Sequence, residues 1–374
     1  MTGIDGHCDE RFKGVRDAFT ANFERGDEVG ASVAVVHDGE MVVDLWGGFV
    51  DEARTRPWER DTITNVFSTT KTMTALCALV LVDRGAIDLD APTAEYWPEF
   101  AAAGKEGVLV RHLMAHTAGL AGWEEPITVE VLYDWERATA LLAAQAPWWE
   151  PGTAIGYHAW TQGYLVGEVV RRVSGRSLGT FFAEELAGPL GADFHIGTGP
   201  EHDHRIADVV PPPLVAGEPS ELALRTLGNP PADPRWAWTE GWRRAEIPAG
   251  NGHGNARSVA RVQSVVSHGG GLDGRRFLSP ETLERIFDEQ ADGVDLVIGV
   301  RNRHGIGYGL ASPQAPVGSN PRTCFWGGWG GSLVVNDLDS RMTVAYVMNR
   351  MGAGTLGDRR GLAVLDAAHE AVAG

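Results

Sequence analysis

The chain contains very little lysine. Among its 32 basic residues only Lys13, Lys71 and Lys105 are lysines, and the other 29 are arginines. An arginine side chain keeps its proton in a protein, whereas a buried lysine can lose it and act as a base. Acidic residues number 50, so the net charge is 32 − 50 = −18, which repels phosphate backbones and anionic membrane surfaces. Neither nucleic acid nor a membrane is expected as a partner.

Cysteine and long apolar runs are also scarce. Cys8, Cys77 and Cys324 are odd in number and widely spaced, so the pattern predicts neither a disulfide framework nor a zinc site, and we expect no metal or cofactor. No apolar run approaches the roughly 20 residues that a membrane helix needs. The N-terminal stretch Met1–His7 lacks the basic and apolar parts of a signal peptide. We therefore expect a soluble, cytoplasmic protein.

The spacing of the residues argues against two other kinds of site, a nucleophile elbow and a metal site. A Gly-x-Ser-x-Gly nucleophile elbow is absent, because the stretch from Gly330 to Val334 (Gly-Gly-Ser-Leu-Val) lacks the closing glycine, and this disfavours an α/β-hydrolase. His202 and His204 flank Asp203 in a proline-rich segment without a third metal ligand in register. We interpret these two histidines as surface residues.

The stretch from Ser68 to Lys71 (Ser-Thr-Thr-Lys) carries the strongest chemical signal. A β-branched approach from Ile63 to Phe67 precedes it, and an apolar-rich run that ends at Gly85 follows it, as is typical of a strand or turn entering a helix. Ser68 is then expected at the helix start, with Lys71 one turn later on the same face. A helix N-terminus offers N–H groups to an anionic serine adduct, and a desolvated lysine can serve as base. The alternative is a capping Ser68 beside a solvated Lys71.

Sheet-forming patterns come from the two ends of the chain. An Asp-Gly turn signal joins two β-branched runs into a hairpin near the N-terminus, and a polar turn joins two more runs near the C-terminus. One helix is predicted before the first hairpin and another after the second. The predicted elements are a helix from about Arg11 to Arg25, strands Ala31–Val36 and Met41–Gly48, strands Ser332–Asn336 and Met342–Met348, and a terminal helix Asp358–Val372.

Helical patterns dominate the middle of the chain. The segment 197–255 is rich in proline and lacks strong periodicity, so it is either a cover over a site or partly mobile. The predicted helices are Arg111–Met114, Val129–Ala146, Thr161–Ser174 and, where regular structure resumes, Ala256–Val262. The sequence therefore predicts an α+β protein with an α/β sheet subdomain (1–92 and 256–374), a mainly helical subdomain with a proline-rich cover (93–255), and an active site at their interface.

Three further motifs follow the Ser-x-x-Lys stretch. They are the stretch from Arg111 to Leu120 (Arg-His-Leu-Met-Ala-His-Thr-Ala-Gly-Leu), the stretch from Tyr157 to Tyr164 (Tyr-His-Ala-Trp-Thr-Gln-Gly-Tyr) and Trp326-Gly327-Gly328. In this order the chain resembles the serine β-lactamase and penicillin-binding-protein superfamily, and within it class C β-lactamases and family VIII carboxylesterases. The resemblance spans nearly the whole chain. It implies a β-lactamase-like fold, with an antiparallel sheet flanked by helices and an inserted mainly helical subdomain.

The resemblance assigns catalytic roles to three side chains. Ser68 matches the acylated nucleophile, Lys71 its amine partner, and Tyr157 the tyrosine of the family's Tyr-x-Asn element, whose third position is alanine here. A phenol near a cation can have a lowered pKa, so Tyr157 with Lys71 is expected to remove the Ser68 proton and return it to the leaving group. The alternative for Tyr157 is a buried aromatic side chain with a bonded hydroxyl. We expect His158 to point elsewhere and His116 to support a turn.

The resemblance places Trp326-Gly327-Gly328 where the family has Lys-Thr-Gly on the strand that lines the site. Trp329 is then expected to supply a backbone N–H that joins the N–H of Ser68 in an oxyanion hole, because glycines let the strand come close. The alternative is a glycine-rich strand that serves packing only. No lysine follows Lys105, so nothing can act as the family lysine that recognises a substrate carboxylate.

These motifs together predict a serine carboxylesterase. We expect it to hydrolyse small to medium, mostly apolar carboxylic esters through an acyl-enzyme on Ser68. The chain has 13 tryptophans, and those near the predicted motifs favour an aromatic-walled pocket for an uncharged small-molecule ester. A β-lactamase, amidase or acyltransferase would use the same acyl-enzyme, and a catalytically silent binding or assembly protein is the alternative from another class. The oligomeric state is left open.

Overall fold

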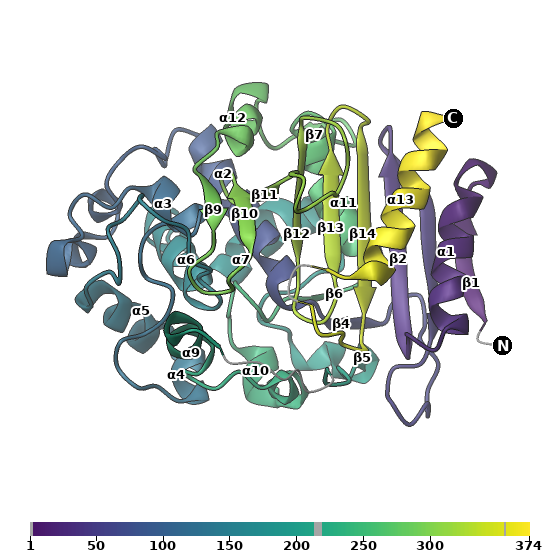
Figure 1. The fold of residues 1–374 in the computed structure, drawn as a ribbon, viewed down its shortest axis with the longest axis horizontal. Coiled ribbons are helices and arrows are strands. Elements are labelled where there is room, and N and C mark those ends of the chain that lie inside the picture. Colours follow the sequence, from purple (N-terminus) through teal and green to yellow (C-terminus); the bar gives the residue numbers. More distant parts are fainter. Residues whose placement is uncertain (1–2, 213–218, 355–356) are drawn as a thin grey trace.

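The computed structural model describes residues 3–212, 219–354 and 357–374. Within these ranges a nine-stranded sheet has the order β1-β3-β2-β14-β13-β12-β11-β10-β9, and every neighbouring pair is antiparallel. β2 and β14 pair at its centre, with Val35 opposite Val344, so the two ends of the chain build one sheet (Figure 1). The strands are β1 (Ile4–Cys8), β2 (Gly30–His37), β3 (Glu40–Gly48), β9 (Ala291–Val294), β10 (Arg301–His304), β11 (Gly309–Leu310), β12 (Thr323–Gly327), β13 (Leu333–Asp337) and β14 (Met342–Met348).

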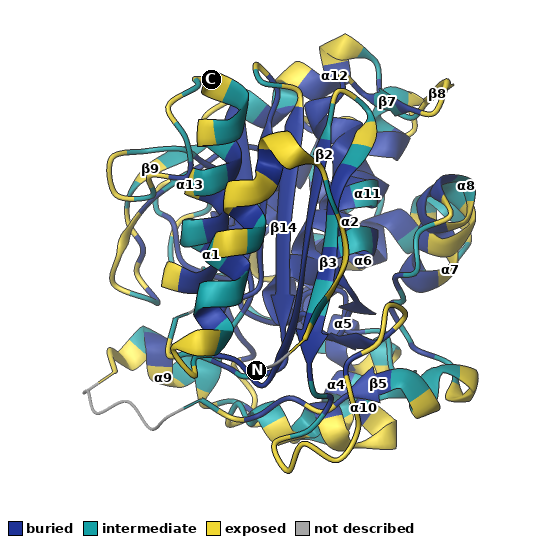
Figure 2. Cartoon of the chain, turned by 90° about the vertical axis from the view of Figure 1, so that its right-hand side faces the viewer, coloured by how far each residue is buried: buried dark blue, intermediate teal, exposed yellow. Residues whose placement is uncertain are grey.

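Helices cover both faces of this sheet. On one face α1 (Lys13–Glu24) and α13 (Arg359–Ala373) pack against each other, and on the other face α11 (Ala256–Ser267) packs against β2, β13 and β14 (Figure 2). Because both faces are covered, β14 is buried along its whole length and β2 along nearly all of it. The predicted α+β class, an antiparallel sheet flanked by helices, is confirmed.

The middle of the chain forms helices at the other end of the molecule from α1 and α13 (Figure 1). Its long helix α6 (Thr161–Ser174) has the predicted bounds and packs against α2 (Thr70–Asp83), the helix that follows the Ser-Thr-Thr-Lys stretch. In the described ranges no helix is long and apolar enough to cross a membrane. The other helices are α3 (Val110–Met114), α4 (Val129–Tyr133), α5 (Trp135–Ala144), α7 (Leu178–Phe182), α8 (Gly188–Leu190), α9 (Glu221–Leu227), α10 (Glu240–Arg244) and α12 (Pro280–Glu284).

Two small sheets complete the fold. β4 (Ile63–Asn65) pairs with β5 (Ile206–Ala207) and β6 (His253–Gly254), and β7 (Gly271–Leu272) pairs with β8 (Arg275–Arg276). None of the nine strands of the main sheet comes from the described residues between 93 and 255. On this ground we propose that residues 1–92 with 256–374, and residues 93–255, are the two subdomains.

Two predicted segments differ in detail from the structure. The helix predicted over Val129–Ala146 is two helices, because Asp134 adopts an extended conformation and its carboxylate caps α5 by accepting from the backbone N–H of Arg137. The proline-rich segment 197–255 contains the short elements β5, α9, α10 and β6, while its residues 213–218 lie outside the described ranges. The cap at Asp134 is a local bond, whereas β5 and β6 are held by pairing to the distant β4, and neither kind of contact leaves a periodic signal in the sequence.

Candidate active site

Ser68 lies in a strained turn between β4 and α2. A single 3₁₀ turn, Phe67–Thr69, joins the two elements. Phe67 has a φ of 45°, in the left-handed region, which costs a non-glycine residue roughly 1–3 kcal/mol. The hydroxyl of Ser332 donates to the carbonyl oxygen of Val66 at 2.8 Å and lies 2.9 Å from the hydroxyl oxygen of Thr69. Contacts from Ser332, the residue before β13, therefore hold a backbone conformation that the local sequence does not favour.

The Ser68 side chain does not cap the helix. α2 begins at Thr70 without a side-chain capping bond. The Oγ atom of Ser68 lies 3.1 Å from Nζ of Lys71 and accepts a hydrogen bond of 2.5 Å from the hydroxyl of Tyr157. Lys71 is only 1% exposed. The alternative of a capping Ser68 beside a solvated Lys71 is therefore wrong, and the structure brings the three predicted catalytic side chains together.

Lys71 is buried among neutral acceptors. Its Nζ donates to the carbonyl oxygens of Ala159 at 2.7 Å and Ala249 at 2.9 Å. Burial lowers the pKa of Lys71 well below its ordinary value. A neutral amine has two N–H groups and one lone pair, so the two carbonyls use both N–H groups and the lone pair is left for the Ser68 hydroxyl. This geometry suits a base that takes the Ser68 proton.

Tyr157 is buried and protonated. Burial raises the pKa of Tyr157 above its ordinary value, and the opposing hydrogen bonds with Ser68 and Trp326 are weaker effects. The Nζ atom of Lys71 lies 4.9 Å from the centre of the phenol ring. The expected lowering of the Tyr157 pKa is wrong, because burial disfavours the charged phenolate and outweighs the hydrogen bonds that favour it. The phenol is a proton donor at rest.

The end of β12 lies against the peptide of Ser68. A Cβ atom on Gly328 would lie 2.2 Å from the carbonyl oxygen of Val66, 2.2 Å from Oγ of Ser332 and 3.3 Å from the Ser68 nitrogen, so only glycine allows this approach. The Trp329 ring packs edge-on against Phe67, with centroids 5.4 Å apart. In the part of the chain that the structure describes, neither the Ser68 N–H nor the Trp329 N–H donates to a protein acceptor. Among the described residues both N–H groups thus lack a protein acceptor, as the predicted oxyanion hole requires.

Trp326 is buried in an aromatic stack beside Tyr157. It is 2% exposed, and its ring stacks on the imidazole of His116 at 5.2 Å with an interplanar angle of 16°. The ring of His304 meets it edge-on at 5.2 Å, and Tyr157 lies 6.2 Å away. Burial lowers the pKa of His116 well below its ordinary value and that of His304 to about 3. Position 326 is therefore surrounded by neutral aromatic groups.

His116 and His158 lie where the sequence predicted them. His116 has a φ of 61° in a turn, and its Nδ1 accepts from the backbone N–H of His158 at 3.0 Å. The His158 ring points away from Ser68: its Nε2 accepts from the N–H of Leu120 at 3.1 Å, and its Nδ1 donates to the Gly156 carbonyl at 2.6 Å. Both histidines hold the backbone around Tyr157.

Sequence reasoning missed three other contributors to the site. Ala159 and Ala249 contribute only their backbone carbonyl oxygens to Lys71. Every residue has such a carbonyl, so the residue type does not reveal this role. Asp295 is buried, and its carboxylate accepts from the backbone N–H groups of Tyr157 at 3.1 Å and Val297 at 2.8 Å. Asp295 follows no recognisable motif. Only the folded structure shows that Asp295 holds the backbone at Tyr157.

Of the two alternating histidines of the proline-rich segment, His204 is exposed and His202 is half-buried beside Arg205. Asp203 pairs with Arg244 at 2.6 Å, and Nδ1 of His202 accepts from Arg205 at 2.8 Å. Within residues 3–212, 219–354 and 357–374 no group of three or more His, Cys, Asp or Glu side chains is arranged to hold a metal ion.

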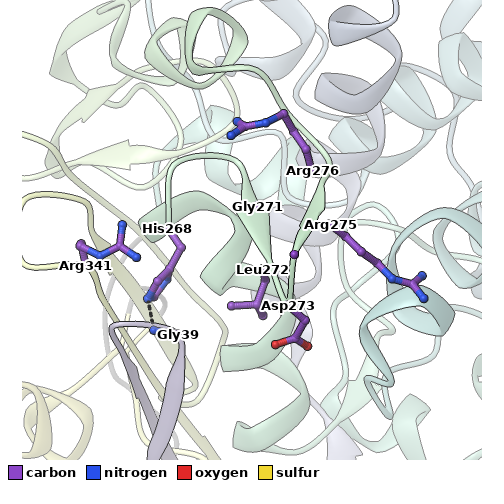
Figure 3. A pocket seen from close by; sticks show the side chains of 9 residues that line it. Gly39, His268, Gly271, Leu272, Asp273, Arg275, Arg276 and Arg341 are labelled. Carbon is purple, nitrogen blue, oxygen red and sulfur yellow. Dashed lines mark hydrogen bonds between the residues drawn. The ribbon is translucent and has the colours of Figure 1, made fainter.

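A separate surface hollow of about 340 Å³ shares no residue with the predicted site (Figure 3). There the N–H of Gly39, in the turn between β2 and β3, donates to Nε2 of His268 at 2.7 Å. Arg341 is paired with Asp38, and the side chains of Arg275 and Arg276 point in different directions (Figure 3). The cations do not converge on one point, so the hollow has no evident ligand.

Comparisons with known proteins agree with the geometry. The sequence family described as Beta-lactamase matches residues 15–369. The protein "Esterase/beta-lactamase LipL" of Mycobacterium tuberculosis (strain ATCC 25618 / H37Rv) is 35% identical over 373 residues, which cover 93% of this chain and 83% of LipL. Two solved structures cover 99% of this chain and 100% of their own: a family VIII carboxylesterase, 44% identical with a TM-score of 0.95, and a penicillin-binding-protein homolog from Caulobacter crescentus, 39% identical with a TM-score of 0.93.

These matches confirm the resemblance that the order of motifs indicated, and with it the β-lactamase-like fold. They extend over nearly the whole chain and are not limited to the short motifs around Ser68. The chain therefore belongs to the beta-lactamase family of proteins.

Proposed function

We propose that this serine hydrolase is a carboxylesterase that acts on small to medium, mostly apolar esters. Membership of the family supports the broader class, and two of the similar proteins carry esterase or carboxylesterase in their names. The observation that carries the proposal is the Ser68 hydroxyl, which lies within hydrogen-bond distance of both Lys71 Nζ, at 3.1 Å, and Tyr157 OH, at 2.5 Å. A nucleophile placed between a neutral base and a protonated acid suits acyl transfer.

In the proposed acylation Ser68 Oγ forms a bond to the ester carbonyl carbon while its proton passes to the lone pair of Lys71 Nζ. The carbonyl oxygen becomes an oxyanion that the backbone N–H groups of Ser68 and Trp329 stabilise. The bond to the alcohol oxygen then breaks, and that oxygen takes the proton of Tyr157. The Lys71 ammonium returns a proton to the phenolate, so both groups end as they began and the alcohol leaves.

Deacylation repeats these roles with water in place of the alcohol. Water adds to the acyl carbon and gives its proton to Tyr157, which passes its own proton to the lone pair of Lys71 Nζ. The same two N–H groups stabilise the second oxyanion. The bond to Ser68 Oγ breaks, and Oγ takes the proton back. The products are the carboxylic acid and free Ser68.

The expected preference for neutral esters depends on position 326. The resemblance implies a lysine there in proteins that recognise a substrate carboxylate, whereas this chain has Trp326 stacked on a neutral His116. A substrate carboxylate beside these rings would lose its hydration and would find no cation to pair with, so its binding would cost free energy. Esters without a carboxylate do not meet this penalty.

A fluorophosphonate probe tests the nucleophile. We expect an intact-mass increase of one phosphonyl group on the wild type and no increase on Ser68→Ala. The matched control is Ser264→Ala, which removes a buried hydroxyl that donates to the Ala260 carbonyl within α11, and this variant should still be labelled. If the wild type is not labelled, the proposal is contradicted and a catalytically silent binding or assembly protein is favoured.

A substrate panel then tests the reaction class. We expect turnover of p-nitrophenyl esters of short and medium chain length, and little or none of a chromogenic cephalosporin. Faster hydrolysis of the cephalosporin than of every ester would identify a β-lactamase instead. Adding alcohols as competing acceptors, and an anilide of the best acyl chain, would reveal an acyltransferase or an amidase.

A further inference from the structure

The turn that presents the Trp329 N–H has little conformational preference of its own. It runs from Gly328 to Gly331, and Gly330 and Gly331 adopt φ values of 96° and 126°. Glycine populates this region without strain but also loses the most freedom when it is fixed there. An oxyanion donor must be held within fractions of an ångström to be effective. The turn is closed by its own bonds, from the N–H of Gly328 to the Ser332 carbonyl at 2.8 Å and from the N–H of Gly331 to the Gly328 carbonyl at 3.1 Å, and contacts from outside add to them.

The carbonyl oxygen of Gly330 is the point where the turn is held. It accepts a hydrogen bond of 2.7 Å from the backbone N–H of Gly352 and another of 2.7 Å from Nη2 of Arg360, near the start of α13. The N–H of Gly330 donates to the carbonyl of Gly354 at 2.9 Å. A Cβ atom on Gly331 would lie 2.6 Å from the same Nη2, so the guanidinium packs directly on this glycine.

Arg360 is itself fixed on every side. Its side chain is 5% exposed, and its Nη2 donates to Oδ2 of Asp358 at 2.6 Å. Its Nη1 donates to Oε1 of the buried Glu28 at 3.0 Å and to the carbonyl of Arg350 at 2.8 Å. A planar guanidinium whose donors are engaged in several directions is a rigid support, which a flexible ammonium cannot reproduce.

We propose that Arg360 is a positioning residue for the oxyanion hole: from α13 it fixes Gly330 and thereby sets the direction of the Trp329 N–H. The inference rests on the proposed function, because it assigns a role within the same acyl transfer. It connects the last helix of the chain to a reaction at Ser68, although Arg360 touches neither the substrate nor the reacting atoms.

The test is Arg360→Lys, which keeps the positive charge beside Glu28 and Asp358 but loses the fork of donors. Active sites are first counted by phosphonylation stoichiometry, so that misfolded protein does not enter the rate. We expect kcat per labelled site to fall about 100-fold, the effect of a displacement near 1 Å, with KM within about threefold. The Ki of a boronic acid, whose adduct with Ser68 mimics the oxyanion intermediate, should rise by a similar factor.

The matched control is Arg359→Lys, the same substitution at the neighbouring position, where the side chain is 73% exposed and pairs with Asp27. It should change neither kcat per site nor the boronic acid Ki. If Arg360→Lys leaves both values unchanged while fewer sites are labelled, Arg360 serves stability only and the inference is overturned. If the wild type itself is neither labelled nor active, the proposed function fails instead, so the two failures are distinguishable.

A second variant covers the case in which Arg360→Lys does not fold. Asp358→Asn keeps the shape of the group that holds Nη2 and Nε of Arg360 but removes its charge. We expect a loss of kcat per site in the same direction, about tenfold, again matched by the boronic acid Ki. An unchanged kcat per site in this variant also counts against the inference.

Discussion

At Lys71 an amine is buried away from water, and no acidic side chain among the described residues pairs with it. The groups that meet its Nζ are the Ser68 hydroxyl and two backbone carbonyls, and burial is the cause of its lowered pKa. A carboxylate at the same distance would have held the proton on the amine. The lowered pKa of Lys71 therefore follows from its surroundings and not from its residue type.

The lowered pKa of Lys71 predicts the pH dependence of turnover. The base must be neutral, so kcat/KM should fall as the pH drops through the lowered pKa of Lys71 and should stay high above it. The raised pKa of Tyr157 keeps the phenol protonated over that range. The measurement is kcat/KM for a neutral p-nitrophenyl ester across the stable pH range. Full activity retained at about pH 5 would contradict a lysine base.

Lys71→Arg should be nearly inactive although it keeps a basic side chain. A guanidinium cannot give up its proton, so we expect kcat to fall by about 10²–10⁴-fold, the usual contribution of a general base. The matched control is Lys105→Arg, a second buried lysine whose Nζ donates to backbone carbonyls, including those of Ala102 at 2.8 Å and Ala143 at 3.0 Å. This control should lose stability and keep kcat per labelled site. Near-wild-type turnover of Lys71→Arg would refute the role.

At the scale of elements, the site is the place where a turn, a strand end and a helix meet. The turn before α2 is strained at Phe67, and Ser332, the residue before β13, holds it through Val66. The end of β12 reaches this turn because Gly328 has no side chain. The segment after α10 joins them where the N–H of Val66 donates to the carbonyl of Gly252 at 2.9 Å. Each of these elements positions one group of the proposed active site.

Gly328→Ala should damage turnover more than it damages the fold. The new methyl group would lie 2.2 Å from the Val66 carbonyl oxygen, so β12 must withdraw from Ser68 and carry the Trp329 N–H with it. We expect kcat to fall about 100-fold or more, as when one oxyanion donor is lost, with a midpoint shift in urea equivalent to about 1–3 kcal/mol. Gly293→Ala on β9 is the control, because no atom lies within 4 Å of its added methyl group. Equal losses of turnover in the two variants would refute the role of Gly328.

At the scale of the whole molecule, the protein buries several histidines in their neutral form. Burial lowers the pKa of His158 to about 4 and the pKa values of His253 and His304 to about 3. In the unfolded chain a histidine titrates near pH 6.5. Between these values the unfolded state binds more protons than the folded state, so acid favours unfolding.

The free energy of unfolding should therefore fall as the pH is lowered from about 6.5 towards 4. Each buried histidine contributes a slope of up to about 1.4 kcal/mol per pH unit in that window, and none of this stability is lost above it. Urea unfolding at several pH values measures the slope. His304→Asn should reduce this slope by the contribution of one histidine, about 1.4 kcal/mol per pH unit at most. The exposed control His7→Asn should leave the slope unchanged. A slope that is the same in His304→Asn would show that His304 is not the group responsible.

Much of the fold could be predicted because its signals are local. The hairpin of β2 and β3 follows from a turn signal between β-branched runs, and α6 follows from its apolar spacing. The break at Asp134 was missed, because a single capping side chain interrupts a pattern that is otherwise helical. The short strands β5 and β6 were missed because they are held by pairing to β4, which lies more than a hundred residues away.

The sequence by itself determined which groups are available: one Ser-x-x-Lys stretch, one tyrosine in the right motif, a glycine-rich strand end and no lysine after Lys105. The tertiary structure decided their chemical states. Whether Lys71 is neutral, Tyr157 protonated and the Trp329 N–H free depends on burial and on partners such as Ala249 and Arg360, which lie far from them along the chain. Protonation and direction are set by the surrounding dielectric and by hydrogen bonds through space, and residue order alone specifies neither.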